Sequence, residues 1–162
     1  MSEREQLELQ DVEYSLWKLH YKLIDEFRKR IKRSSANAES PKLGTTQSPN
    51  NHVAEFRLFL LEATKFYQKL ILKIREYCGV PKEGLLYKAF DASKGIDPKN
   101  KKKTCRFLCH RLLVCLGDLA RYMEQHEKPD VHSHKWLAAA THYLEATMVW
   151  HDSGNPHNQV IL

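Results

Sequence analysis

The sequence lacks a long uninterrupted apolar run, and it has only four cysteines, six glycines and six prolines in 162 residues. Its longest apolar stretch, Phe56–Ile74, is interrupted by one arginine, one glutamate and three lysines, which argues against a membrane-spanning helix. The first ten residues, MSEREQLELQ, are acidic and polar, unlike a secretory signal peptide. We therefore expect reduced thiols and a cytoplasmic protein that shuttles to the nucleus.

Catalytic signatures are missing as well. The chain contains no G-x-S-x-G motif, no glycine-rich phosphate loop and no H-E-x-x-H motif. Cys105 and Cys109 would share one helix face, but His110 and Cys115 point elsewhere, so the spacing favours packing cysteines over a tetrahedral metal site. We predict a protein that is not an enzyme and that holds no metal and no cofactor.

Helical periodicity is the dominant positive signal. The composition, 42% hydrophobic and 28% charged, is that of a folded domain. Apolar residues recur at spacings of three and four, which predicts helices over residues 5–33, 52–77, 104–125 and 133–150 and no strands. Polar, proline-containing and glycine-containing segments predict flexible loops over residues 34–51 and 91–103. The expected architecture is a single all-α domain over residues 1–162.

Small residues in the last two predicted helices indicate close packing. Gly117 and Ala120 lie on one helix, and Ala139, Tyr143 and Ala146 recur at spacings of four and three on the next. Small side chains let two helices approach closely while a large neighbour fills the adjacent hole. This pattern is typical of a tetratricopeptide-type repeat, although an ordinary antiparallel helical hairpin would show it too.

Positive charge is in excess, with a net charge of +6 and a pI of about 9.1. This excess favours acidic partners such as nucleic acid or a phosphoprotein. Two basic runs, Arg28–Arg33 and Lys99–Lys103, could contact nucleic acid through a salt-sensitive and sequence-independent attraction. A basic helix end and a solvated loop explain the same two runs equally well.

Four segments carry a family resemblance. In chain order they are LWKLHYKLIDEFRKRI, FLLEATKFYQKLILKIREYCGVP, CHRLLVCLGDLARY and SGNPHNQ. Together they resemble the SMG/Est family of nonsense-mediated mRNA decay factors and telomerase-associated Est proteins, especially its plant SMG-seven-type members. The resemblance implies a 14-3-3-like domain of antiparallel, tetratricopeptide-like helical hairpins. It also implies binding to phosphoserine or phosphothreonine segments of the up-frameshift RNA helicase.

The same resemblance implies particular binding residues. The phosphate-binding lysine of the family corresponds to Lys22, and its phosphate-binding arginine corresponds to Arg121. Tyr122 matches the tyrosine that follows this arginine and could donate its hydroxyl to the phosphate, and Asn158 matches an asparagine that contacts the peptide backbone. An arginine offers a planar, two-pronged donor and a lysine a compact charge, so the pair suits a phosphate with nearly two negative charges.

Each cation also has a simpler interpretation. Lys22 precedes Asp25 and Glu26 by three and four residues, and Arg121 follows Asp118 by three. Each could therefore form a weak ion pair along its own helix.

The resemblance also implies a C-terminally incomplete superhelix, because family members continue well past the SGNPHNQ block. Two alternatives to a phosphopeptide adaptor follow. One is a nucleic-acid or telomerase-associated module that uses the basic runs, and the other is a truncated remnant without function. The expected partners are the phosphorylated helicase, a related SMG-type protein, and RNA or a telomerase complex, with no membrane partner.

Overall fold

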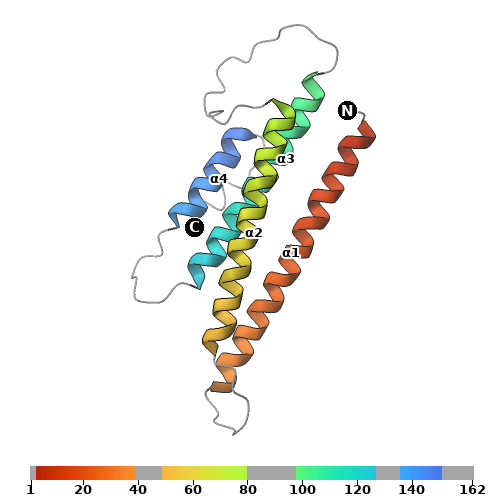
Figure 1. Ribbon diagram of the computed structural model, residues 1–162. Helices are drawn as coiled ribbons and strands as arrows, with labels where there is room; N and C mark the ends of the chain where they lie inside the picture. The colour runs from red at the N-terminus through yellow and green to blue at the C-terminus, as the bar shows by residue number, and fades with distance from the viewer. Residues whose placement is uncertain (1–2, 39–48, 80–97, 127–135, 151–162) are drawn as a thin grey trace.

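A computed structural model of the chain describes residues 3–38, 49–79, 98–126 and 136–150. It contains four helices, α1 (Glu3–Ala38), α2 (Pro49–Cys78), α3 (Pro98–Gln125) and α4 (Leu137–Val149), and these ranges contain no strand. Successive helices run in opposite directions (Figure 1). The all-α class expected from the sequence is thus confirmed. None of the described helices is both long enough and apolar enough to cross a membrane.

Three helices extend into segments that the sequence had indicated as loops. α1 continues to Ala38, and the hydroxyls of Ser34 and Ser35 donate to carbonyl oxygens one turn earlier, at 3.0 and 3.1 Å, an arrangement that a helix can accommodate. α2 and α3 begin at Pro49 and Pro98, and proline suits the first helical position because no intrahelical bond needs its missing N–H. The loop prediction is therefore wrong for residues 34–38, 49–51 and 98–103. Residues 39–48 and 91–97 lie outside the described ranges.

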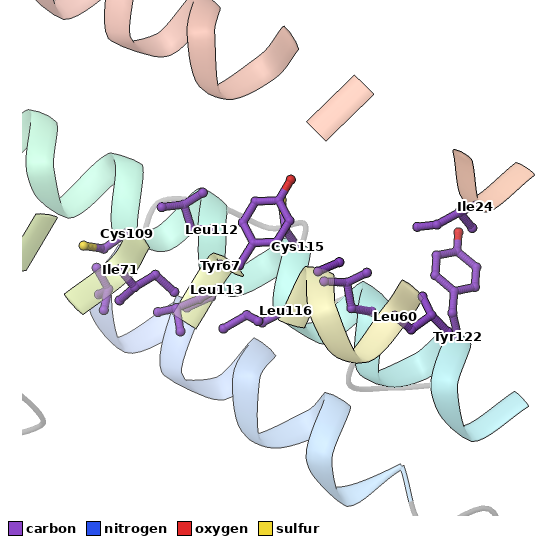
Figure 2. Close-up of a cluster of buried hydrophobic side chains, with 14 of the residues drawn as sticks. Ile24, Leu60, Tyr67, Ile71, Cys109, Leu112, Leu113, Cys115, Leu116 and Tyr122 are labelled. Carbon is purple, nitrogen blue, oxygen red and sulfur yellow. The ribbon is translucent and has the colours of Figure 1, made fainter. Parts of the chain in front are cut away.

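The core forms where α2, α3 and α4 meet (Figure 2). Among the described residues, α1 contributes one fully buried apolar side chain, Ile24, to this cluster. The other helices contribute bulky residues at helical spacing: Phe56, Leu60, Tyr67, Ile71, Leu112, Leu113, Leu116, Leu119, Tyr122 and Val149. Burial of such apolar surface is the main force that holds the helices together.

α3 and α4 approach each other closely at Gly117. A Cβ atom placed on Gly117 would lie 2.6 Å from Cδ1 and 2.7 Å from Cζ of Tyr143, so only glycine leaves room for this ring. Ala139 and Ala146 are buried on the facing side of α4. The close packing predicted from these small residues is therefore present.

α1 packs on the other helices through aromatic and polar contacts. The rings of Trp17 and His20 lie 5.9 and 5.2 Å from the Tyr67 ring of α2, and the Tyr67 hydroxyl lies 3.2 Å from His20 Nδ1. Phe27 stacks on Phe56 of α2 with ring centroids 5.4 Å apart. Nearer the N-terminus, the buried carboxylate of Glu13 accepts a hydrogen bond of 2.7 Å from Arg111 Nε of α3. Near the start of α1, apolar side chains are exposed, including Leu7 and Val12.

Candidate functional site

Arg121 is held in place by a polar junction on α3. Its Nη2 donates to Asp118 Oδ1 at 3.1 Å, and the Tyr143 hydroxyl of α4 donates to the same oxygen at 2.7 Å. Burial raises the pKa of Asp118, whereas the Tyr143 hydrogen bond and the Arg121 charge oppose that rise. The Arg121 side chain is 30% exposed, its Nε atom is buried, and its Nη2 atom is held by Asp118. The ion pair between these two residues, expected as the simpler interpretation, is present.

Tyr122 lies in the core rather than on the surface. Its side chain is buried beside Ile24 of α1 (Figure 2). The guanidinium carbons of Arg28 and Arg121 each lie 5.6 Å from its ring centroid. Burial, followed by the effects of Tyr21 and Asp118, raises the pKa of Tyr122 against the lowering effect of the two arginines. The ring therefore serves as a platform on which two cations rest.

Lys22 is exposed on α1, and its neighbours along the helix include Ile24, which lies beside Tyr122 (Figure 2). The adjacent Tyr21 is close enough to Tyr122 to influence its pKa. Asp25 and Glu26, the acids expected to pair with Lys22, instead contact Lys29 at 2.7 and 3.6 Å.

Packing of α1 against α3 thus brings the turn of Lys22 to the turn of Arg121, across almost a hundred residues of sequence. Arg28 was not singled out from the sequence as a site residue, because it sits in a basic run that also suits a helix end. Its position seven residues after Tyr21, on the same helix face, was the available signal.

The cysteines correct one expectation. Cys78 and Cys105 form a disulfide, so the prediction that all four thiols are reduced is wrong. The end of α2 and the start of α3 bring their Cα atoms to 6.5 Å, within the range that a disulfide needs, and sequence spacing could not show this. Cys109 and Cys115 are buried free thiols, and burial raises the pKa of both. No group of three or more His, Cys, Asp or Glu side chains suited to a metal ion occurs in the described ranges.

Two further predictions concern other parts of the chain. Asn158, the expected contact to the peptide backbone, lies outside the described residues. The lysine run at the start of α3 is described in part. Lys101 Nζ lies 3.8 Å from the ring centroid of Tyr77, and Lys103 Nζ lies 6.0 Å from that of Trp150. These two lysines rest on aromatic rings of their own chain.

The chain is similar to known proteins over most of its length. Residues 11–127 match the family described as telomerase activating protein Est1. A nonsense-mediated mRNA decay factor SMG7-like protein of Arabidopsis thaliana is 46% identical over 153 residues, which cover 94% of this chain and 14% of that protein. The nonsense-mediated mRNA decay factor SMG7 of the same plant is 36% identical, with 96% and 16% covered. The telomerase-binding protein EST1A of Danio rerio is 25% identical, with 94% and 9% covered. The chain therefore spans a small part of the length of these relatives.

Proposed function

Because the chain belongs to the family of the telomerase activating protein Est1, we propose that it is a non-enzymatic adaptor domain that binds phosphoserine or phosphothreonine peptides. The observation that carries this proposal is the arrangement around Tyr122. Arg121 is oriented by Asp118 and partly exposed, and its neighbour Tyr122 lies near Tyr21, the residue that precedes the exposed Lys22 on α1.

The chemistry suits a phosphoryl group. Lys22 and Arg121 would approach its oxygens from two helices, with Lys22 acting as a point charge and Arg121 as an oriented donor. Asp118 already fixes one edge of the Arg121 guanidinium, which reduces the side-chain entropy that binding must overcome. Tyr122 supports the site by packing in the core and does not contact the ligand.

The relatives suggest the biological setting. Two of them are named as nonsense-mediated mRNA decay factors and one as a telomerase-binding protein. Together with the sequence resemblance, these names favour an adaptor of mRNA decay whose partner is the phosphorylated up-frameshift RNA helicase. We place this activity in the cytoplasm, with shuttling to the nucleus.

Fluorescence anisotropy with a labelled peptide that carries one phosphoserine tests the proposal. We expect Lys22→Glu and Arg121→Glu each to weaken binding at least about tenfold, because each replaces an attractive charge by a repulsive one. The unphosphorylated peptide should not bind. Lys69→Glu, which reverses an exposed lysine on α2, is the matched control and should change affinity by less than about twofold at physiological salt.

Arg121→Lys separates charge from geometry. It keeps the positive charge but loses the two-pronged donor, so affinity should fall less than in Arg121→Glu. Circular dichroism of each variant checks that the helices remain folded. If both charge reversals leave phosphopeptide affinity unchanged, the assignment of the site is wrong. Tight, salt-sensitive binding of an unphosphorylated oligonucleotide would favour the nucleic-acid alternative instead.

A further inference from the structure

A covalent link joins the end of α2 to the start of α3, which lie side by side (Figure 1). Cys78 is the last residue of α2, and its disulfide partner Cys105 lies two turns into α3. One turn before Cys105, Lys101 places its Nζ atom 3.8 Å from the ring centroid of Tyr77. The same junction therefore carries both a covalent and a noncovalent contact.

The packing of α2 on α3 does not depend on this link. Two turns away from the disulfide, Ile71 of α2 and Leu112 of α3 are buried in the common core. Burial of apolar surface holds these turns together whether or not the sulfur atoms are bonded. Opening of the disulfide should therefore loosen the two helix ends and leave the rest of α2 and α3 packed.

The end of α2 brings Cys78 close to solvent. The residues on either side of it, Tyr77 and Gly79, are exposed, and Tyr77 is 68% exposed. Gly79 has a φ of +63°, a left-handed conformation that commonly ends a helix. A disulfide is opened by a thiolate that reaches one of its sulfur atoms. The position of Cys78 at a helix end makes its sulfur the accessible one of the pair.

The other two cysteines are placed where they do not interfere with the pair. Cys109, one turn after Cys105, and Cys115 are buried free thiols. Burial raises the pKa of both, and for Cys109 it outweighs the lowering effect of Arg75. Because the thiolate is the attacking form, both residues stay unreactive at neutral pH. The link therefore has two states, bonded and open, without rearrangement to another pairing.

We propose that the disulfide between Cys78 and Cys105 is a reversible redox switch, which glutathione opens and glutathione disulfide closes. This proposal rests on the cytoplasmic setting of the proposed function, because disulfides of cytosolic proteins are usually transient.

The exchange takes two steps. A glutathione thiolate attacks Cys78 Sγ, the bond between the two cysteine sulfur atoms breaks, and Cys105 leaves as a thiolate that takes up a proton. A second glutathione thiolate attacks the glutathione sulfur of the mixed disulfide. This step releases glutathione disulfide and Cys78 as a thiolate, which is then protonated. Closing runs through the same steps in reverse, with glutathione disulfide as the oxidant.

The switch acts on one end of the pair of α2 and α3. Arg121 lies more than four turns further along α3 than Cys105, about 24 Å at about 1.5 Å per residue. Opening should therefore change the stability of the chain and leave the affinity of the candidate phosphate site unchanged.

Counting of free thiols tests the chemistry. The folded chain is equilibrated with glutathione disulfide or with excess glutathione, quenched in acid, and labelled with N-ethylmaleimide in denaturant. Intact-protein mass spectrometry should find two labels in the first sample, on Cys109 and Cys115, and four in the second. Four labels in the oxidised sample, or two in the reduced one, would overturn the switch.

Thermal melts test the consequence. The bonded chain should melt at least about 5 °C above the open chain, because the bond restricts the unfolded chain. Cys78→Ser and Cys105→Ser should each melt at one temperature in both glutathione buffers. Cys109→Ala is the matched control on the next turn of α3 and should keep the difference. Loss of the difference in this control, or its survival in Cys78→Ser, would contradict the assigned pair.

Anisotropy with the singly phosphorylated peptide keeps this inference separate from the proposed function. We expect equal affinity, within about twofold, for the bonded and the open chain. A difference of more than about fivefold would show that opening reaches Arg121, against a switch confined to the helix ends. A chain that opens and closes its disulfide but binds no phosphopeptide in either state would refute the proposed function and support the exchange chemistry.

Discussion

The interface between α3 and α4 and the interface between α1 and the other helices are built on different principles. At the first, Gly117 admits the ring of Tyr143, and small buried residues of α4 keep the two helices close. At the second, Ile24 is buried in the core, the rings of Trp17, His20 and Phe27 pack against aromatic rings of α2, and Glu13 forms an ion pair with Arg111 of α3. The first interface depends on the close approach of two helices, and the second on large aromatic side chains together with polar contacts.

This difference bears on the candidate site, which lies across the second interface. Lys22 belongs to α1, whereas Arg121 belongs to the closely packed pair of α3 and α4. The arginine is thus fixed by Asp118 and Tyr143 within a tight framework. The lysine depends on how α1 rests on α3. A substitution that affects only one of the two interfaces should therefore affect only one of the two proposed phosphate-binding cations.

The largest expected contrast is between Leu119 of α3 and Leu19 of α1. Leu119 is fully buried, whereas Leu19 is 65% exposed. Leu119→Ala should lower the free energy of unfolding by about 3 kcal/mol, because it removes buried methyl groups and leaves a cavity. Leu19→Ala should change it by less than about 0.5 kcal/mol. Urea denaturation followed by circular dichroism measures both, and equal losses would contradict the burial described for these two leucines.

A smaller effect is expected from Gly117→Ala. Alanine is the better helix former by about 1 kcal/mol, so it would stabilise an exposed helical position. Here the new methyl group overlaps the Tyr143 ring, and we expect a net loss of about 1 to 2 kcal/mol. The cost should largely vanish in the background of Tyr143→Ala, which removes the ring. A double-mutant cycle on unfolding free energies measures this coupling, and additive effects would contradict the packing described.

The smallest effect concerns pH, with one histidine near each interface. Burial lowers the pKa of both His126 and His142 below the ordinary value of 6.5. Above that value both folded and unfolded chains hold neutral imidazoles, and the stabilisation is fully present. As the pH falls toward the folded-state pKa, the unfolded chain takes up protons first, so stability is lost.

Thermal melts between about pH 7.5 and about pH 5.5 should therefore show a falling melting temperature as the solution is acidified. His126→Gln and His142→Gln should each reduce this slope. A slope that neither substitution changes would mean that other groups control the response. A larger reduction by His142→Gln would place more of the response in the tight α3–α4 pair than at the junction with α1.

The helices and their close packing could be predicted from the sequence, whereas the helix ends and several contacts between distant residues could not. Periodicity located all four helices, and Gly117 with Ala146 indicated where α3 and α4 meet. Helix ends were less predictable. The Ser34 and Ser35 hydroxyls donate to carbonyl oxygens within α1, and composition does not show whether a serine lies in a helix or in a loop. The position of Arg28 over the Tyr122 ring could not be predicted. Within a basic run of sequence, a solvated arginine cannot be told from one that packs over an aromatic ring.

The sequence by itself determined the all-α class, the positions of the helices and the family to which the chain belongs, since these depend on local periodicity and on motifs within single segments. Only the tertiary structure decided which distant residues meet. Packing of α1 on α3 brings Tyr21 and Arg28 to Tyr122, and the end of α2 meets the start of α3 at the disulfide between Cys78 and Cys105. The physical reason is that such pairings depend on how whole helix faces bury one another, and no short stretch of sequence contains that information.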